Sequence, residues 1–437
     1  MHCSPRIAVF SDGERFPYLE GDDGLMSFWP TLFSSVELRG KKNAAGTIRN
    51  GLNAISHLHA WEQVEGRNLL KEFLEQQFPT IEDIESLRDH CYRDARDLKK
   101  YVARVKQLSA CSLNLVAPVN QVPLQTVQKS HAYNRMTVIG KYLYFCAVTL
   151  LRGRPNAGAL YAKAKSMRDA LLAHRPKGKT RRSGLSIHPS PEYFDEFLTV
   201  VAEDSPDNPF KSPEVRLRNY VMFQIIFETG IRSGELLSLY VGDVTYDHQG
   251  GPIIRVIDRP DDQADPRTNA PQVKTLERDI PISQGLFDKT CEYITVRYAT
   301  PNARKHPLLF VNHKNGEFQG LPMSDRNFQR ELKRVVAVRP ERFKDIRRHG
   351  FRHNFNVRLT DKLDLHSLQG KPLTDKQRLE IRKNLNGHKG DSSGEVYEQN
   401  ATRQKAHNAI RQYQDKNSSY LKAALEQAKG SRKDVDD

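Results

Sequence analysis

Residues 212–237 read SPEVRLRNYVMFQIIFETGIRSGELL, and they hold the helix and the turn from which the fold can be predicted. Ser212 before Pro213 is typical of a helix start, because serine caps unpaired amides and proline fits the first helical position. Gly230 ends the helix, since glycine readily takes the left-handed conformation of a helix C-terminus. One face of this helix is apolar and is formed by Leu217, Val221 and Ile225.

The turn after this helix reads Thr229-Gly230-Ile231-Arg232-Ser233-Gly234-Glu235 and leads directly into a second helix. Arg232 therefore lies between two helices, where its guanidinium can point into a cleft. Taken alone, an arginine in such a turn would be a surface charge. A functional role for Arg232 depends on partners supplied by later segments of the chain.

The segments after this turn predict a small antiparallel sheet and then more helix. Strand-like runs occupy 252–257 and 273–282, and a loop rich in Asp and Pro joins them at 258–271. After Pro307 the sequence is mostly helical. Thr374 and Gln377 form a capping box, and the helix that they open closes at Asn386-Gly387.

The part of the chain before residue 176 predicts a helical domain. Residues 1–46 contain Pro, Gly and Asp clusters and are interpreted as a loosely structured entry segment. Thr47 is the expected N-cap of a helix that ends at Gly66, and Thr80, with Asp83 at the third helical position, opens another. A third helix passes through Val138, Tyr142, Phe145 and Cys146 towards Leu150.

These patterns give a mainly α fold with a small antiparallel β-sheet, divided into segments. We expect an N-terminal segment (1–46), a helical domain (47–175), a basic linker (176–189), a second domain (190–410) and a C-terminal tail (411–437). The linker holds the run Lys177-Gly178-Lys179-Thr180-Arg181-Arg182 and is either a solvated connection or a segment that runs along phosphates.

The charge balance favours a polyanionic partner. The 437 residues carry a formal net charge of +15, and the pI is about 9.5. Such a surplus can neutralise phosphates and release their counterions, although a basic protein without nucleic acid remains open on charge alone.

The cysteines and the apolar segments predict the compartment. The five cysteines are scattered and form no CxxC pair, which argues against disulfides and a cysteine-built zinc site and favours a reducing cytosol. We expect no signal peptide, and the apolar stretch at 221–227 is too short to span a membrane. The cysteines are Cys3, Cys91, Cys111, Cys146 and Cys291.

Cutting DNA without a metal ion needs a defined set of side chains. The attacked phosphate gains charge in the transition state, and guanidinium groups can meet that charge at any accessible pH. A protein nucleophile keeps the bond energy in a covalent intermediate if the strand is to be rejoined. A general acid must protonate the leaving 5′ oxygen.

The sequence offers these groups in order along the second domain. Lys274 lies near the turn of the hairpin, and His349 and Arg352, three residues apart, share one face of a helix. His349 and His353 also resemble half of a zinc site, but Gly350 replaces the glutamate of H-E-x-x-H and no third ligand is evident. The candidate set is Arg232, Lys274, His349, Arg352, His388 and Tyr397.

On these residues the chain resembles the tyrosine recombinases, also called phage integrases. The family pattern is an arginine in G-x-R-x-x-E, a hairpin lysine, H-x-x-R, G-H and a tyrosine nine residues later, and residues 190–400 contain each part in this order. The resemblance implies that the candidate set forms the active site, with another hairpin residue as the alternative to Lys274. It implies that Glu235 supports the site by holding Arg232 or the His349–Arg352 segment.

The resemblance also implies an activity and partners. We expect residues 47–175 to be a core-type DNA-binding domain and 190–410 the catalytic domain of a site-specific recombinase that forms a 3′-phosphotyrosyl intermediate. The expected partners are double-stranded DNA, three further copies in a homo-tetramer on paired sites, and accessory or directionality proteins, with a monomer when free. No metal, nucleotide or other cofactor and no membrane is implied.

Several alternatives stay open. A type IB topoisomerase shares this chemistry but relaxes DNA alone, and a catalytically silent DNA-binding protein would share the fold. The expected setting is a mobile element or phage in a prokaryotic cytoplasm, near the nucleoid. The tail from Ala401 onwards either folds back on its own domain or docks on a neighbouring protomer, and the loop at 258–271 is a candidate contact for DNA or a neighbouring subunit.

Overall fold

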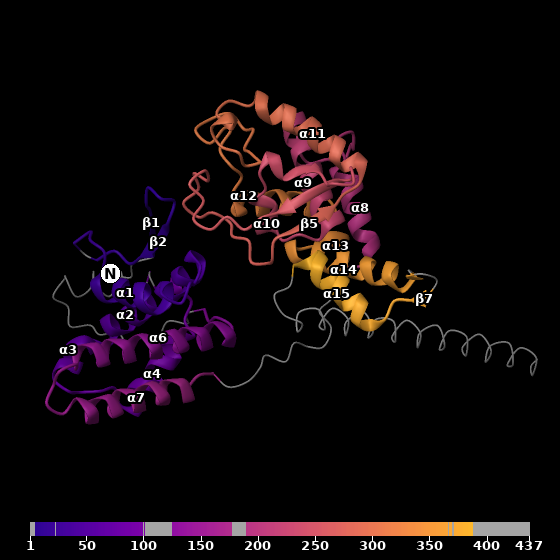
Figure 1. Ribbon diagram of the computed structural model, residues 1–437. Coiled ribbons are helices and arrows are strands. Elements are labelled where there is room, and N and C mark those ends of the chain that lie inside the picture. The colour runs from indigo at the N-terminus through magenta and orange to yellow at the C-terminus, as the bar shows by residue number, and fades with distance from the viewer. Residues whose placement is uncertain are drawn as a thin grey trace, which may run out of the picture. The chain divides into compact units, whose positions relative to one another are not determined.

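A computed structural model describes most of the chain as two compact units, residues 1–186 and 187–437 (Figure 1). The residues that it describes are 5–21, 23–98, 100, 125–176, 189–365, 367–368 and 371–387. Most of the basic linker, His388, Tyr397 and the C-terminal tail lie outside these residues. The described part is mostly helical with small antiparallel sheets, as the sequence predicts.

The first unit consists of one short hairpin and a set of helices. Its elements are β1 (Arg6–Val9), β2 (Arg15–Tyr18), α1 (Phe28–Phe33), the π-helix η1 (Ser34–Arg39), α2 (Ala45–Glu65), α3 (Leu69–Leu74), α4 (Ile81–Cys91), α6 (Lys129–Leu150) and α7 (Ala157–Ala173). Helix α6 packs on α7 and on α2, and Figure 1 shows α6 and α7 side by side. The core between these helices includes the buried Trp61, Ile139 and Leu171.

The beginning of the chain corrects one expectation from the sequence. Residues 5–46 are not a loose entry segment, because they form β1, β2, α1 and η1. Leu19 and Phe33 are fully buried in the core of the first unit, and Phe33 packs edge-on against Tyr142 of α6. Apolar contacts with α6 therefore order a segment whose Pro and Gly content suggested a loop.

The helix limits agree closely with the capping signals. Thr80 caps α4 in a full capping box with Asp83, and Gly66 ends α2 in the left-handed conformation, as predicted. Helix α2 starts three residues earlier than expected, with Ala44 and not Thr47 as its N-cap.

The second unit places a three-stranded sheet among helices. Its elements are α8 (Pro191–Val201), α9 (Pro213–Thr229), α10 (Ser233–Leu237), the 3-10 helix η3 (Val241–Asp243), β3 (Val244–Tyr246), β4 (Pro252–Val256), β5 (Arg278–Pro281), α11 (Gln284–Ala299), the 3-10 helix η4 (Ala303–Lys305), α12 (Asp325–Val336), α13 (Pro340–Phe343), α14 (Arg348–Leu365), β6 (Ser367–Leu368), β7 (Lys371–Pro372) and α15 (Asp375–Asn386).

Helix α9 is central to this unit. It packs on α8, α11 and α14, and its buried Phe223 meets Phe197 of α8 and Phe351 of α14. The Ser212 hydroxyl accepts a hydrogen bond from the Val215 amide, which confirms the predicted start of α9.

The sheet has the strand order β3–β4–β5, and each neighbouring pair is antiparallel. Strand β5 is shorter than the predicted run 273–282, because residues 273–277 leave the sheet. The Leu276 amide donates instead to the carbonyl of Gly387, 3.0 Å away, and the Thr275 hydroxyl donates to Glu235. This departure brings the hairpin to the end of α15 and to α10.

No helix among the described residues is long and apolar enough to cross a membrane.

Candidate active site

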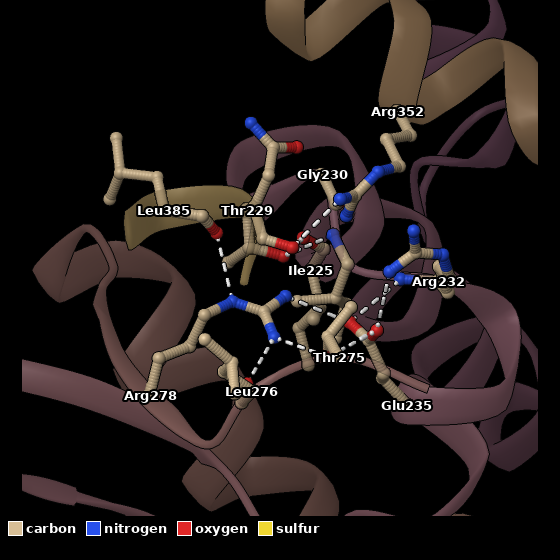
Figure 2. Close-up of polar contacts among 12 residues, drawn as sticks. Ile225, Thr229, Gly230, Arg232, Glu235, Thr275, Leu276, Arg278, Arg352 and Leu385 are labelled. Atoms are coloured by element: carbon tan, nitrogen blue, oxygen red, sulfur yellow. Dashed lines mark hydrogen bonds and ion pairs between the residues drawn. The ribbon is translucent and has the colours of Figure 1, made fainter. Parts of the chain in front are cut away.

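Arg232 is fixed at its backbone and at its side chain by one carboxylate. It is the N-cap of α10, and its amide donates to Oε2 of Glu235 at 3.1 Å while its Nη1 donates to Oε1 at 3.2 Å. The Arg232 side chain keeps 30% exposure, whereas that of Glu235 has none. Glu235 thus holds the Arg232 guanidinium, while part of that side chain stays exposed to solvent (Figure 2).

Glu235 is an ionised group inside the protein. It accepts further hydrogen bonds from Nη2 of Arg278 at 2.8 Å and from the Thr275 hydroxyl at 2.9 Å. Burial alone raises its pKa, but Arg278, the Arg232 amide and the charge of Arg352 outweigh burial and leave the pKa below its ordinary value. The structure thus pairs Glu235 with Arg232, one of the two supporting arrangements implied by the sequence.

Arg352 connects three segments that are distant in the sequence. It lies on α14 and is buried, and its Nη1 donates to the carbonyl of Gly230 at 3.0 Å. Its Nη2 donates to the carbonyl of Asn386 at 2.8 Å. The α9–α10 turn and the C-terminus of α15 are therefore tied to the same guanidinium.

His349 precedes Arg352 by one helical turn, and its side chain is exposed. Partial desolvation lowers its pKa below the ordinary 6.5, and the charges of Arg348, Arg232, Arg352 and Lys274 lower it further. The ring is therefore neutral at pH 7 and lies within electrostatic reach of the other candidate cations.

Lys274 is exposed in the segment that leads into β5, outside the sheet. The positive charge of Lys274 lowers the pKa of His349, as the charges of Arg232 and Arg352 do. Arg232, Lys274 and Arg352 therefore all lie within electrostatic range of His349. His388 and Tyr397, the other two candidates, lie outside the described residues.

The C-terminus of α15 is held by the same cluster. The carbonyls of Leu385, Asn386 and Gly387 accept hydrogen bonds from Arg278, Arg352 and the Leu276 amide, respectively. Gly387 has a φ of +60°, and a Cβ there would lie 2.7 Å from Nη1 of Arg278 and 2.9 Å from the Leu276 carbonyl. Both the backbone conformation and the close approach require glycine.

Arg278 is a residue of this cluster that motif spacing does not identify. Its side chain is only 7% exposed and lies on the buried face of β5, which Ile280 continues. A charged residue in register with buried Ile280 is the signal that could have identified it, because such a charge must have a partner inside the fold.

The described site can bind an anion. The charges of Arg232, Lys274 and Arg352 all lower the pKa of His349, and the buried Glu235 is an ion-pair partner of Arg232. Forked guanidinium groups fit the planar set of oxygens on a phosphate. In the described part of the chain, no three His, Cys, Asp or Glu side chains are grouped so that they could hold a metal ion.

Part of the second unit matches a known protein family. A family model described as "Phage integrase family" matches residues 205–370, which include Arg232, Lys274, His349 and Arg352. A search of the curated proteins found no significant match.

Two solved structures are similar to the chain at low sequence identity. They are the XerH site-specific recombinase bound to palindromic difH substrate in a post-cleavage complex and XerH bound to difH substrate in a pre-cleavage complex. The first is 16% identical with a TM-score of 0.40 and covers 76% of this chain and 84% of its own. The second is 17% identical with a TM-score of 0.38 and covers 73% and 81%.

The family match rests on the segment that builds the arginine cluster. Residues 205–370 run from the loop before α9 through α14 and β6, and therefore contain the Arg232 turn, the hairpin and the His349–Arg352 helix. Residues 205–370 of the chain thus form a phage integrase domain, the domain of the tyrosine recombinase family.

Proposed function

We propose that this chain cleaves and rejoins duplex DNA with Tyr397 as nucleophile, and that Arg232, Lys274, His349, Arg352 and His388 assist the reaction. The observation that carries the proposal is that Arg352 bonds the Gly230 carbonyl in the turn that presents Arg232, 120 positions earlier, while the buried Glu235 carboxylate holds Arg232. A phosphate placed there would meet two guanidinium groups that are already oriented, which is the preorganisation that phosphoryl transfer requires.

The bond changes in the proposed reaction balance without a cofactor. The Tyr397 oxygen attacks the scissile phosphorus and loses its proton to a neighbouring base, for which the neutral His349 is suited. The bond from phosphorus to the 5′ oxygen breaks, and that oxygen takes a proton from a cationic donor such as Lys274. In the reverse step a 5′ hydroxyl attacks the 3′-phosphotyrosine and releases Tyr397.

The wider biological setting is part of the same proposal. Recombination exchanges four strands, so four copies of the chain would assemble on two double-stranded DNA sites, with accessory or directionality proteins. Residues 47–175 would bind the DNA core and 190–410 would carry the catalysis. The tail from Ala401 would dock on a neighbouring copy, and the DNA served would be a mobile element or phage in a prokaryotic nucleoid.

A nicked suicide duplex tests the central step. Duplexes tiled across the DNA that flanks the gene carry a nick beside each candidate cleavage point, so that the short 5′-hydroxyl fragment diffuses away and the adduct accumulates. A detergent-resistant protein–DNA adduct is expected on at least one duplex. Absence of any adduct, with DNA binding intact, would instead identify a catalytically silent DNA-binding protein.

A second candidate function is that of a type IB topoisomerase, because the same cluster could serve DNA relaxation. Purified protein is incubated with supercoiled plasmid and, separately, with two duplexes that carry the cleaved site. Joined recombinant duplexes and a multimeric synapse support recombination. Relaxation of plasmid that lacks the site, without synapse formation, would support the topoisomerase.

A further inference from the structure

Arg278 lies at the start of β5 and is nearly buried, although its sequence neighbours Glu277 and Asp279 are exposed. Its backbone pairs with Val256 of β4, so the sheet fixes where its side chain begins. The backbone of Arg278 is therefore held by the sheet, and its guanidinium can hold the groups that it binds at a defined distance from one another.

The Arg278 guanidinium donates hydrogen bonds to three separate segments. Its Nη2 donates to Oε2 of Glu235 at 2.8 Å, and its Nε donates to the carbonyl of Leu385 at 2.9 Å. Its Nη1 donates to the Thr275 hydroxyl at 2.8 Å and to the Leu276 carbonyl at 3.2 Å. Figure 2 shows this side chain between the Glu235 carboxylate and the Leu385 carbonyl.

The hydrogen bond from Arg278 to Glu235 affects Arg232. Glu235 is shared between Arg278 and Arg232, and its side chain is completely buried. If Arg278 were removed, the carboxylate would hold Arg232 as its one remaining ion-pair partner among the described residues. Arg232 would then be drawn towards Glu235 and the protein interior, and less of its charge would be available to a phosphate.

The hydrogen bond from Arg278 to the Leu385 carbonyl holds the C-terminus of α15. The carbonyls at a helix C-terminus carry partial negative charge and need donors when they are buried. Arg278 supplies the donor for Leu385, and the loop that it braces supplies the Leu276 amide for Gly387. His388, the next residue in the sequence, is one of the candidate site residues.

We propose that Arg278 is a positioning residue for strand cleavage, which links the Glu235–Arg232 pair to the C-terminus of α15. The inference rests on the function proposed above and adds a residue to it. Arg278 itself does not touch the DNA. It acts through Arg232, whose charge it keeps available, and through the helix end that it holds.

Two substrates distinguish this role from simple stabilisation. The first is the nicked duplex on which the wild-type protein forms its adduct. The second is the same duplex with a methylphosphonate at the scissile position, in which a methyl group replaces the charged oxygen. The neutral linkage needs less cationic compensation, so loss of Arg232 should matter less on it than on the phosphodiester.

The variants are Arg278→Ala, Arg278→Lys, Arg232→Ala and, as a matched control, Arg297→Ala. Arg297 is also buried in the second unit and donates to the carbonyls of Leu308, Ala303 and His306, but none of these is a site residue. Single-turnover cleavage rates on both duplexes are measured, and thermal unfolding is recorded for each protein.

Arg278→Ala should lower cleavage of the phosphodiester by about 10- to 100-fold, by analogy with the loss of a residue that orients a metal ligand. Its loss should be smaller on the methylphosphonate, in parallel with Arg232→Ala. Arg278→Lys should recover part of the rate, because an ammonium keeps the charge beside Glu235 but cannot also reach Leu385. Arg297→Ala should lower thermal stability and leave the rate per folded molecule unchanged.

Two outcomes would overturn the two proposals separately. If Arg278→Ala lowers both rates by one common factor, or behaves like Arg297→Ala, Arg278 has a structural role alone and this inference is wrong. If Arg278→Ala does not fold, the same comparison with Arg278→Lys decides. If Arg232→Ala cleaves the phosphodiester normally, the proposed function itself fails.

Discussion

The Nη1 of Arg352 donates a hydrogen bond to the carbonyl of Gly230, 3.0 Å away and 122 positions earlier in the chain. Gly230 ends α9 in the left-handed conformation, and Arg232 comes two residues later as the N-cap of α10. The bond therefore fixes the spacing between the helix that carries Arg352 and the turn that carries Arg232. Each arginine depends on the placement of the other.

Arg232→Ala and Arg352→Ala should each remove about 3 kcal/mol of transition-state stabilisation, by analogy with the loss of one donor from an oxyanion site. Lysine at either position should recover little, because an ammonium cannot make two parallel bonds to a phosphate. Single-turnover cleavage of the suicide duplex gives the rates, and a DNA-binding titration serves as the control for intact binding. Equal rates in wild type and variants would contradict this role.

Gly230→Ala should destabilise the second unit. Its φ is +63°, which costs an alanine about 1–2 kcal/mol, and a Cβ would lie 2.4 Å from the Phe355 ring. The matched control is Gly285→Ala in α11, where a Cβ would meet no atom within 4 Å. Calorimetric unfolding should show a lower transition temperature for Gly230→Ala alone. Equal temperatures in the two variants would show that the turn tolerates a side chain.

His349 should titrate below 6.5 in the DNA-free protein, because desolvation and four nearby cations disfavour its charged form. The unfolded chain therefore binds this proton first, so the His349 contribution to stability falls as the pH drops below 6.5 and stops changing below the folded pKa. NMR titration of labelled histidine gives the pKa, and Arg348→Ala should raise it.

The same titration can be repeated with bound duplex DNA. A phosphate at the cluster would offset the cations and raise the pKa of His349. A pKa at or above 6.5 in the free protein, or no response to Arg348→Ala, would contradict the placement of His349 beside these charges.

Adduct formation should persist in EDTA, since the proposed electrophilic groups are side chains. The assay compares initial rates on the suicide duplex with and without the chelator. Loss of the adduct in EDTA, and then recovery with magnesium or zinc, would show that a metal ion takes part in the reaction.

Much of the fold could be predicted from local signals. The capping box at Thr80, the start of α9 at Ser212 and the ends of helices at Gly66 and Gly387 are confirmed, because each depends on backbone chemistry within one turn. The order of residues 5–46 could not be predicted from local signals, since it comes from contacts with α6, more than a hundred positions away.

In the candidate site too, some residues can be predicted from local spacing and others depend on contacts with distant segments. Its residue types and spacing point to Arg232, His349 and Arg352, which helices and turns present locally. Arg278 could not be identified by spacing, because its partners Glu235 and Leu385 lie 43 and 107 positions away. The shortening of β5 has the same cause, since the residues before it bond to α10 and α15 and leave the sheet.

The identity of the residue bound to DNA tests the proposed mechanism most directly. The adduct trapped on the suicide duplex is digested with protease and nuclease, and mass spectrometry locates the modified side chain and the end of the DNA to which it is joined. The mechanism predicts a 3′-phosphate ester on Tyr397, and a Tyr397→Phe protein that binds the duplex but forms no adduct. An adduct on any other residue, a 5′ linkage, or an adduct formed by Tyr397→Phe would contradict it.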